Sequence, residues 1–309
     1  MNRIYGLALL LVLLTHAVAG AAGLPVARKT VTVKNKDVDI SIEYPRTGNR
    51  AIDATLLAYA KDAVAQFEGD AVDKPQTENA YTLETTYAVE RNDGKMFAVV
   101  FNEYTFTGGA HPNDNTVTFN FLLPDGARVF LPEIVDGARG IATVSQLTTA
   151  QLTRVLGNPP DPSGAGPLAD NFKAFVWLPT KLHIYFPPYQ VAAYAAGPQE
   201  AIIPLAQLQN VIRADWRAPA PSFDCSKAAR HIETAICADA ALARLDRQTA
   251  EAYQTKLNFA YAPADKDRLR QSQRDWIATR NARCHSAALG ACLTKMYRDR
   301  LAVLMRPPA

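Results

Sequence analysis

Four cysteines near the carboxyl end of this 309-residue chain are the residues best suited to carry chemistry. They are Cys225, Cys237, Cys284 and Cys292, and His285 directly follows the third. Such a set can bind zinc, cycle between thiol and disulfide, or form structural disulfides. Zinc ligands usually lie two to four residues apart in each half of a site, and redox pairs usually have two residues between their cysteines. Here eleven and seven residues intervene, so the spacing favours disulfides and leaves His285 as a neighbour, not a metal ligand.

The amino-terminal segment predicts an oxidising compartment for these thiols. The short basic start "MNR" precedes the apolar run "IYGLALLLVLL" and small residues, and Ala17-Val18-Ala19 fits an A-x-A cleavage site. This layout is typical of a secretory signal peptide, which we assign to residues 1–22, and the apolar run is short for a membrane span. We therefore expect a periplasmic or secreted protein that has no membrane span after cleavage and whose cysteines form disulfides.

Four cysteines allow three pairings, and sequence alone does not choose among them. We expect the local pairing of Cys225 with Cys237 and of Cys284 with Cys292. Residues eight positions apart in one helix are ~12 Å apart along its axis, whereas disulfide-bonded Cα atoms lie within ~7 Å. The chain must therefore turn between Cys284 and Cys292, and we expect Gly290 to permit that turn.

A second group of residues has the character of a partner-binding surface. It comprises polar and glycine positions of one loop and two tyrosines of the segment "FPPYQVAAYAAGP". The candidates are Gly108, Gly109, His111, Asn113, Tyr189 and Tyr194. The glycines suit a tight turn or a close backbone approach, and His111 suits a loop-fixing or partner-contacting role. Tyrosines on loops can be binding anchors, although aromatic side chains are more often core.

Known catalytic spacings are missing from the sequence. The histidines form no H-x-x-x-H pattern, and neither G-x-S-x-G nor G-x-x-x-x-G-K-[ST] occurs. We therefore predict that the protein is not an enzyme, with no catalytic residues, no metal site and no cofactor; the alternative is a cell-wall hydrolase or an accessory to a deacetylase.

Periodicity predicts an α+β domain over residues 23–216. Alternating apolar and polar residues indicate strands, and Asn92-Asp93-Gly94 and Pro124-Asp125-Gly126 indicate hairpin turns. The expected strands form an antiparallel sheet accompanied by one or two helices. The strand segments are 30–45, 80–109, 115–135, 173–188 and the start of 199–208, and the helices are 51–69 and 142–157.

A proline-rich linker at 217–223 separates this domain from a region in which every periodic signal is helical. We expect a small all-α helical domain held by disulfides at 224–309, with helices over 241–260, 265–283 and 291–304. Residues 222–309 carry 15 Lys and Arg against 9 Asp and Glu, a net charge of +6, whereas residues 20–221 carry 17 against 21, a net charge of −4. Such asymmetry suggests two modules with different surfaces, and we expect no nucleic-acid partner for an exported chain.

The helical domain resembles the LprI-type lysozyme-inhibitor domain of exported bacterial proteins. The resemblance covers residues 222–305 and rests on spaced residues of "FDCSKAARHIETAICADAALARLDRQTAEAYQ", "LRQSQRDWIATRNARC" and "CLTKMYRDRLAVL". Those residues are Cys225, Glu233, Ile236, Cys237, Leu245, Asp246, Tyr253, Arg274, Trp276, Arg280, Cys284 and Cys292. The family's usual glutamate-lysine pair reads Glu233-Thr234 here. Lysozyme inhibition is the activity that this resemblance implies.

The first domain resembles the RsiV-type ectodomain, which is also found beside peptidoglycan deacetylase domains. The loop from Gly108 to His111 and the segment from Phe186 to Pro198 carry the match, which extends over residues 30 to about 212. In that family the ectodomain of a sigma-factor regulator binds lysozyme.

Two resemblances with a link to lysozyme predict an exported cell-envelope binding protein that binds or inhibits lysozyme-like muramidases by occluding their cleft. The alternative is a periplasmic envelope scaffold or a peptidoglycan-binding protein with no role toward lysozyme. Many lysozymes are basic, so the −4 domain would attract them and the +6 domain would repel them. We therefore expect lysozyme contact at the first domain.

Overall fold

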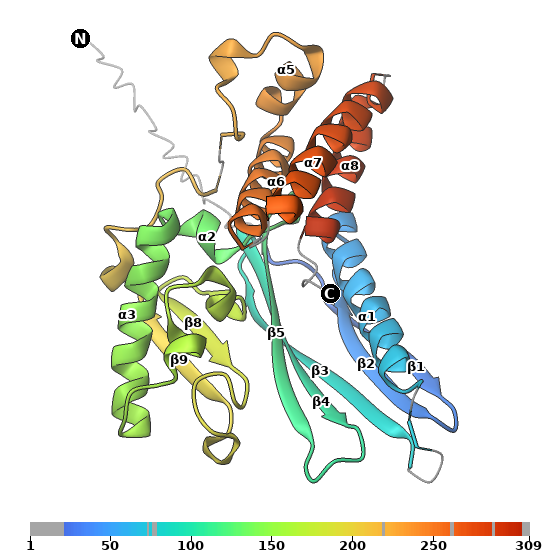
Figure 1. The fold of residues 1–309 in the computed structure, drawn as a ribbon, viewed down its shortest axis with the longest axis vertical. Helices are drawn as coiled ribbons and strands as arrows, with labels where there is room; N and C mark the ends of the chain where they lie inside the picture. The colour runs from blue at the N-terminus through green and yellow to red at the C-terminus, as the bar shows by residue number, and fades with distance from the viewer. Residues whose placement is uncertain are drawn as a thin grey trace, which may run out of the picture.

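A computed structural model describes residues 22–72, 74–75, 79–217, 220–259, 263–285 and 288–304. A sheet-rich α+β region precedes a region built only of helices (Figure 1), which confirms the predicted fold class. The predicted signal peptide lies outside the described residues except for its last position.

Six strands form the larger sheet, in sequence order. They are β1 (Ala27–Lys34), β2 (Val38–Arg46), β3 (Tyr81–Asn92), β4 (Met96–Phe106), β5 (Asn113–Leu122) and β6 (Ala127–Arg128). Neighbouring strands are antiparallel as predicted, except that β2 and β3 are parallel. The exception arises because α1 (Arg50–Asp70) connects these two strands, and a helical crossover returns the chain in the same direction.

The predicted β3–β4 turn is held by a side chain. The carboxylate of Asp93 accepts hydrogen bonds from the backbone N–H groups of Lys95 and Met96, while Gly94 adopts a φ of 73°. The predicted strand after Pro124 is only two residues long. It ends where Pro132, which has no N–H for a ladder, opens the short helix α2 (Leu131–Ile134).

One face of the sheet is covered by α1. The helix begins at an Asn49 cap and buries Ile52 and Leu56 against Phe97 and Phe101. Farther along, the helix covers the apolar side of β2 and the start of β3. Burying large apolar side chains in this way contributes ~1.5–3 kcal/mol each, so this layer fixes the position of the strands and of the loops that join them.

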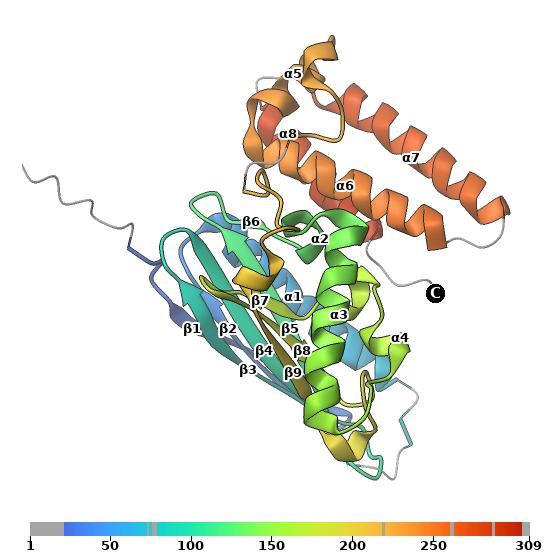
Figure 2. The ribbon, with the colours of Figure 1, turned by 90° about the vertical axis from the view of Figure 1, so that its left-hand side faces the viewer.

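A second, three-stranded sheet packs on the opposite face of β4 and β5. Its strands are β7 (Phe175–Trp177), β8 (Lys181–Phe186) and β9 (Gln199–Pro204). The buried amide of Asn120 on β5 joins the layers, since its Nδ2 donates to the Phe175 carbonyl and its Oδ1 accepts from the Trp177 N–H. The helix α3 (Gly137–Leu156), longer than its predicted extent, covers the outside of β9 (Figure 2).

The carboxyl-terminal region contains α5 (His231–Ala238), α6 (Ala240–Phe259), α7 (Pro263–Arg283) and α8 (Leu289–Leu304). The last three correspond to the three predicted helices. Their shared core contains Ile236, Leu242, Leu293 and Tyr297.

The two regions meet at a buried polar contact between α6 and α2. Gln248 donates from Nε2 to Glu133 Oε2 at 3.0 Å and to the Arg128 carbonyl at 2.7 Å. Arg244 Nη1 lies 3.6 Å from Glu133 Oε1, and both of these side chains are 2% exposed. Burial raises the pKa of Glu133 to about 7 although Arg244 opposes the shift. The helices are therefore coupled to the sheet region through ionisable side chains.

Candidate functional site

His111, Tyr189 and Tyr194 lie together in the structure, as one aromatic cluster. His111 comes from the loop between β4 and β5, and the tyrosines come from the connection between β8 and β9. The rings of His111 and Tyr194 stack with 3.9 Å between their centroids, and the Tyr189 ring lies 5.3 Å from that of Tyr194. Two loops from two different sheets therefore form one surface.

A single carbonyl oxygen fixes the geometry of the cluster. The backbone oxygen of Pro112 accepts from the Tyr194 hydroxyl and from His111 Nδ1, each at 2.9 Å. Because a carbonyl only accepts, the proton of a neutral His111 ring lies on Nδ1. His111 Nε2 is then an acceptor, and the Tyr189 hydroxyl lies 3.5 Å from it.

Tyr189 combines exposure with an unusual backbone. Its φ is 71°, a left-handed value that is uncommon outside glycine, and 61% of its surface is exposed. Holding a bulky residue in this conformation costs ~1–3 kcal/mol. The backbone therefore presents the tyrosine ring outward beside His111 instead of burying it.

The other residues predicted for this surface, Gly108, Gly109 and Asn113, do not contribute side chains to the aromatic cluster. Gly108 provides the left-handed turn of the loop with a φ of 79°. Gly109 does not have a left-handed φ, and a Cβ added to it would meet no atom within 4 Å, so the structure does not require a glycine there. Asn113 begins β5, where its carbonyl accepts from the Thr105 hydroxyl, and its own side chain is exposed. Among the candidates, only the three aromatic residues come together.

The aromatic segment divides into core and surface positions. Phe186 is 1% exposed and packs edge-on against Phe172, whereas Tyr185 is half-buried. The exposed ring of Tyr189, beside the half-buried ring of Tyr194, can stack on sugar rings or receive apolar side chains of a protein partner. Within the part of the chain that the structure describes, no group of three or more His, Cys, Asp or Glu residues is arranged to hold a metal ion.

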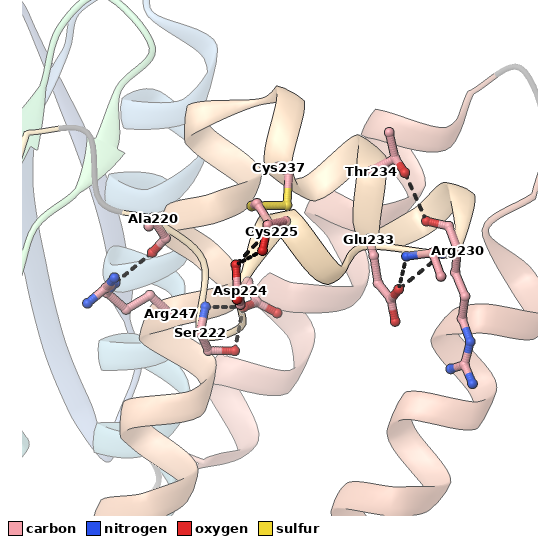
Figure 3. The surroundings of a disulfide bond; sticks show 12 residues. Ala220, Ser222, Asp224, Cys225, Arg230, Glu233, Thr234, Cys237 and Arg247 are labelled. Carbon is pink, nitrogen blue, oxygen red and sulfur yellow. Dashed lines mark hydrogen bonds between the residues drawn. A yellow bond between two sulfur atoms is a disulfide. The ribbon is translucent and has the colours of Figure 1, made fainter.

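Both predicted disulfides are present with the local pairing. Cα atoms are 5.9 Å apart for Cys225 and Cys237, and 5.5 Å apart for Cys284 and Cys292. The first bond ties the segment before α5 to the end of that helix (Figure 3). The expectation that Gly290 forms the turn was wrong. The reversal lies between Arg283, where α7 ends, and Leu289, where α8 begins, so Gly290 falls in the first turn of α8.

Asp246 and Arg280, two of the residues that carry the LprI resemblance, form a buried network with Tyr297 in the helical region. The Tyr297 hydroxyl donates to Asp246 Oδ1 and accepts from Arg280 Nη1, each at 2.6 Å. Burial raises the Tyr297 pKa above its ordinary range, and the Asp246 carboxylate adds to the shift. The Trp276 ring packs edge-on against the Tyr297 ring. These side chains hold the three long helices together, and His285 lies exposed beside the disulfide.

Sequence reasoning missed the contact between the two regions. Glu133 and Gln248 are 115 positions apart, and neither belongs to a recognisable motif. It also missed Tyr104, which is 39% exposed on a central strand. Side chains two positions apart on a strand share a face, so the polar Asn102 indicated that Tyr104 lies on the same, solvent-accessible side of β4.

Comparisons with known proteins divide the chain into three matched stretches. Residues 225–304 match the family described as Lysozyme inhibitor LprI. Residues 31–114 match Deacetylase PdaC, and residues 133–206 match a protein family of unknown function, DUF3298. The chain therefore carries an LprI-type domain after a PdaC-type and a DUF3298-type region, as the two resemblances predicted.

A curated relative is the peptidoglycan-N-acetylmuramic acid deacetylase PdaC of Bacillus subtilis, 26% identical over 194 residues. The match takes in 60% of this chain but 42% of that protein, so the chain spans less than half of its relative.

Two DUF3298 family crystal structures are similar to 63% and 62% of the chain. The one from Pseudomonas aeruginosa PAO1 has a TM-score of 0.48, 13% identity and 97% of its own chain covered. The one from Bacteroides fragilis NCTC 9343 has a TM-score of 0.43, 15% identity and 96% covered. None of the described helices is long and apolar enough to cross a membrane.

Proposed function

We propose that this chain is an exported cell-envelope protein that binds lysozyme-like muramidases and inhibits them by occluding the substrate cleft. The observation that carries the proposal is the LprI family match over residues 225–304, a family described as a lysozyme inhibitor. The PdaC-type region supports a place near peptidoglycan. The two disulfides are consistent with an oxidising compartment outside the cytoplasm.

The aromatic cluster of His111, Tyr189 and Tyr194 is the surface that we assign to the contact. A cleft that binds a glycan strand accepts flat rings, and two tyrosines on turn-restrained loops can enter such a cleft at little entropic cost. The LprI-type region bears the surplus of positive charge, which would repel a basic muramidase. The helical region then serves to hold the sheet region, through the contact at Glu133.

Muramidase turnover on a cell-wall suspension tests this function. Residues 23–309, with both disulfides formed, should abolish most turnover at a one-to-one ratio of protein to lysozyme. The Tyr194→Ala variant should inhibit weakly, and Tyr194→Phe, which keeps the ring, should inhibit nearly as well as the natural chain. Full turnover at stoichiometric ratios, together with no complex in size-exclusion chromatography, would reject the proposal.

A second candidate is a peptidoglycan-binding scaffold without a lysozyme role. It is favoured by the match to a protein named as a peptidoglycan deacetylase, since a region that accompanies such an enzyme can bind the same polymer. Sedimentation with purified peptidoglycan distinguishes the two, because a scaffold should co-sediment without altering lysozyme turnover.

A further inference from the structure

The larger sheet has one face that is only partly covered. The helix α1 packs on one side, and the β7–β9 layer lies on the other side over β4 and β5. Figure 2 shows β1, β2 and β3 extending beyond that layer, with α1 behind them. No described element covers this extension, so its side chains meet solvent.

The strand register places acidic, hydroxyl and aromatic side chains in rows across this open face. One row runs from Thr32 on β1 through Ser41, Glu84 and Tyr104 to Asp114 on β5. Neighbouring members of a row lie ~4.8 Å apart along the hydrogen-bonding direction. Of these five, all but Ser41, which is half-buried, are exposed.

A further carboxylate extends the face toward the second sheet. Exposure alternates along β3, where Glu84, Thr86, Ala88 and Glu90 are all exposed. The β3–β4 register shifts between Val89 and Arg91, at Glu90, and the Glu90 charge adds, after burial, to the raised pKa of Tyr185 on β8. The open face therefore continues to the edge of that layer.

Charge on the face is balanced at its edge and unbalanced at its centre. On the β1–β2 edge, Arg28 pairs with Glu43, and Lys34 pairs with Asp39. Among the described residues, no lysine or arginine forms an ion pair with Glu84, Glu90 or Asp114. Glu84 and Asp114, neither with a counter-charge, flank the exposed Tyr104 in its row, and the unpaired Glu90 lies six positions farther along β3, ~20 Å from Glu84.

We propose that this open sheet face, defined by Glu84, Thr86, Glu90, Tyr104 and Asp114, is a docking surface for a cationic protein partner. Lysine and arginine side chains of the partner would pair with the three carboxylates, and Tyr104 would pack against their aliphatic stems or guanidinium groups. The face deepens the proposed function and rests on it, since a basic muramidase is the partner that both require.

The position of the face supports this assignment. The strands β4 and β5 lead from the row of Tyr104 and Asp114 directly into the loop that carries His111. A partner whose cleft receives the aromatic cluster would therefore extend over the acidic row. A solvated face is common in antiparallel sheets, but solvation alone does not call for an unpaired carboxylate on each side of an exposed tyrosine.

A charge-matched pair of variants tests the docking surface. The face variant is Glu84→Gln/Glu90→Gln/Asp114→Asn. The control variant is Asp62→Asn/Glu68→Gln/Asp70→Asn, which removes the same charge from exposed positions on α1, behind the sheet. Binding of a basic lysozyme is measured by calorimetry at 50, 150 and 300 mM NaCl. Binding of a fluorescent decalysine peptide, which needs no muramidase fold, is measured by anisotropy with the same three proteins.

The face variant should lose on the order of tenfold in lysozyme affinity at 50 mM NaCl and should show a weaker salt dependence, while the control should change by about twofold or less. Equal losses in both variants, with lysozyme bound by the natural chain, would overturn the docking surface and leave the proposed function standing. Failure of the natural chain to bind lysozyme would reject the proposed function. The decalysine peptide then tests the docking surface without lysozyme. Weaker peptide binding to the face variant than to the control variant supports the docking surface, and equal peptide binding to both variants overturns it.

Discussion

The imidazole ring of His111 stacks on the phenol ring of Tyr194 at 3.9 Å, and both side chains bond to the backbone oxygen of Pro112. The two residues come from loops of different sheets. Each loop restrains the other, so the cluster is a single rigid surface, and variants that remove the ring differ from variants that remove only the hydroxyl.

Tyr194→Ala should weaken lysozyme binding by about 2 kcal/mol, because a central aromatic anchor is lost. Tyr194→Phe keeps the stack and loses only the intramolecular bond to Pro112, so it should bind lysozyme nearly as tightly as the natural chain. Calorimetric titration measures both values. Equal affinities of the alanine variant and the natural chain would show that the cluster does not contact the partner.

Removing either disulfide should lower the free energy of unfolding by about 2–4 kcal/mol. The two bonds should differ in their accessibility to reductant, because Cys284 is 0% exposed within the helical core whereas Cys225 is exposed. Mass mapping after brief treatment with dithiothreitol should therefore show the Cys225–Cys237 bond opened first. Reduction of Cys284–Cys292 before that bond would contradict the burial seen here.

Glu133→Gln should make stability less dependent on pH. Burial raises the pKa of Glu133 from 4.5 to about 7, so the folded protein holds this proton more tightly than the unfolded chain does. The resulting stabilisation is complete below about pH 4.5 and is lost as the pH rises through about 7. Relative to the natural chain, the variant should therefore gain stability across this window, by no more than about 3 kcal/mol.

Urea denaturation between pH 4 and 8 measures this difference. A constant offset between Glu133→Gln and the natural chain over the whole range would contradict the assignment. Gln248→Ala is the matched control, because it removes a hydrogen bond to the same carboxylate without removing the titrating group.

Tyr297→Phe should destabilise the helical region by about 1–3 kcal/mol. The substitution keeps the ring packed on Trp276 but leaves buried Asp246 and Arg280 without the hydroxyl between them. Helical ellipticity during thermal unfolding measures the effect. An unchanged midpoint would indicate that water or a direct Asp246–Arg280 bond replaces the hydroxyl.

Much of the architecture could be predicted because local patterns determine it. The Asn92-Asp93-Gly94 turn, the apolar stripe of α1 and the cysteine spacings each act over a few residues or one helical face. The local disulfide pairing was predictable for the same reason, because each pair of cysteines is close in the sequence. The turn predicted at Gly290 was wrong, because the helix α8 begins before that residue.

Contacts between residues that are far apart in the chain could not be predicted from the sequence. Nothing in the pattern of 30–69 says that β2 and β3 run parallel, since that depends on where α1 packs. The sequence indicated the loops of His111 and Tyr194 as two separate candidates, and it did not indicate that their rings stack. The Glu133–Gln248 contact has no motif or periodicity in the sequence that would predict it. In each case the decisive neighbour lies far away in the chain.

Hydrogen–deuterium exchange on the complex with a basic lysozyme shows which surface of the chain the partner covers. Exchange should slow in residues 104–114 and 187–198, which contain the aromatic cluster, and should change little in residues 225–304. Protection confined to residues 225–304, or no protection at saturating lysozyme, would contradict this prediction.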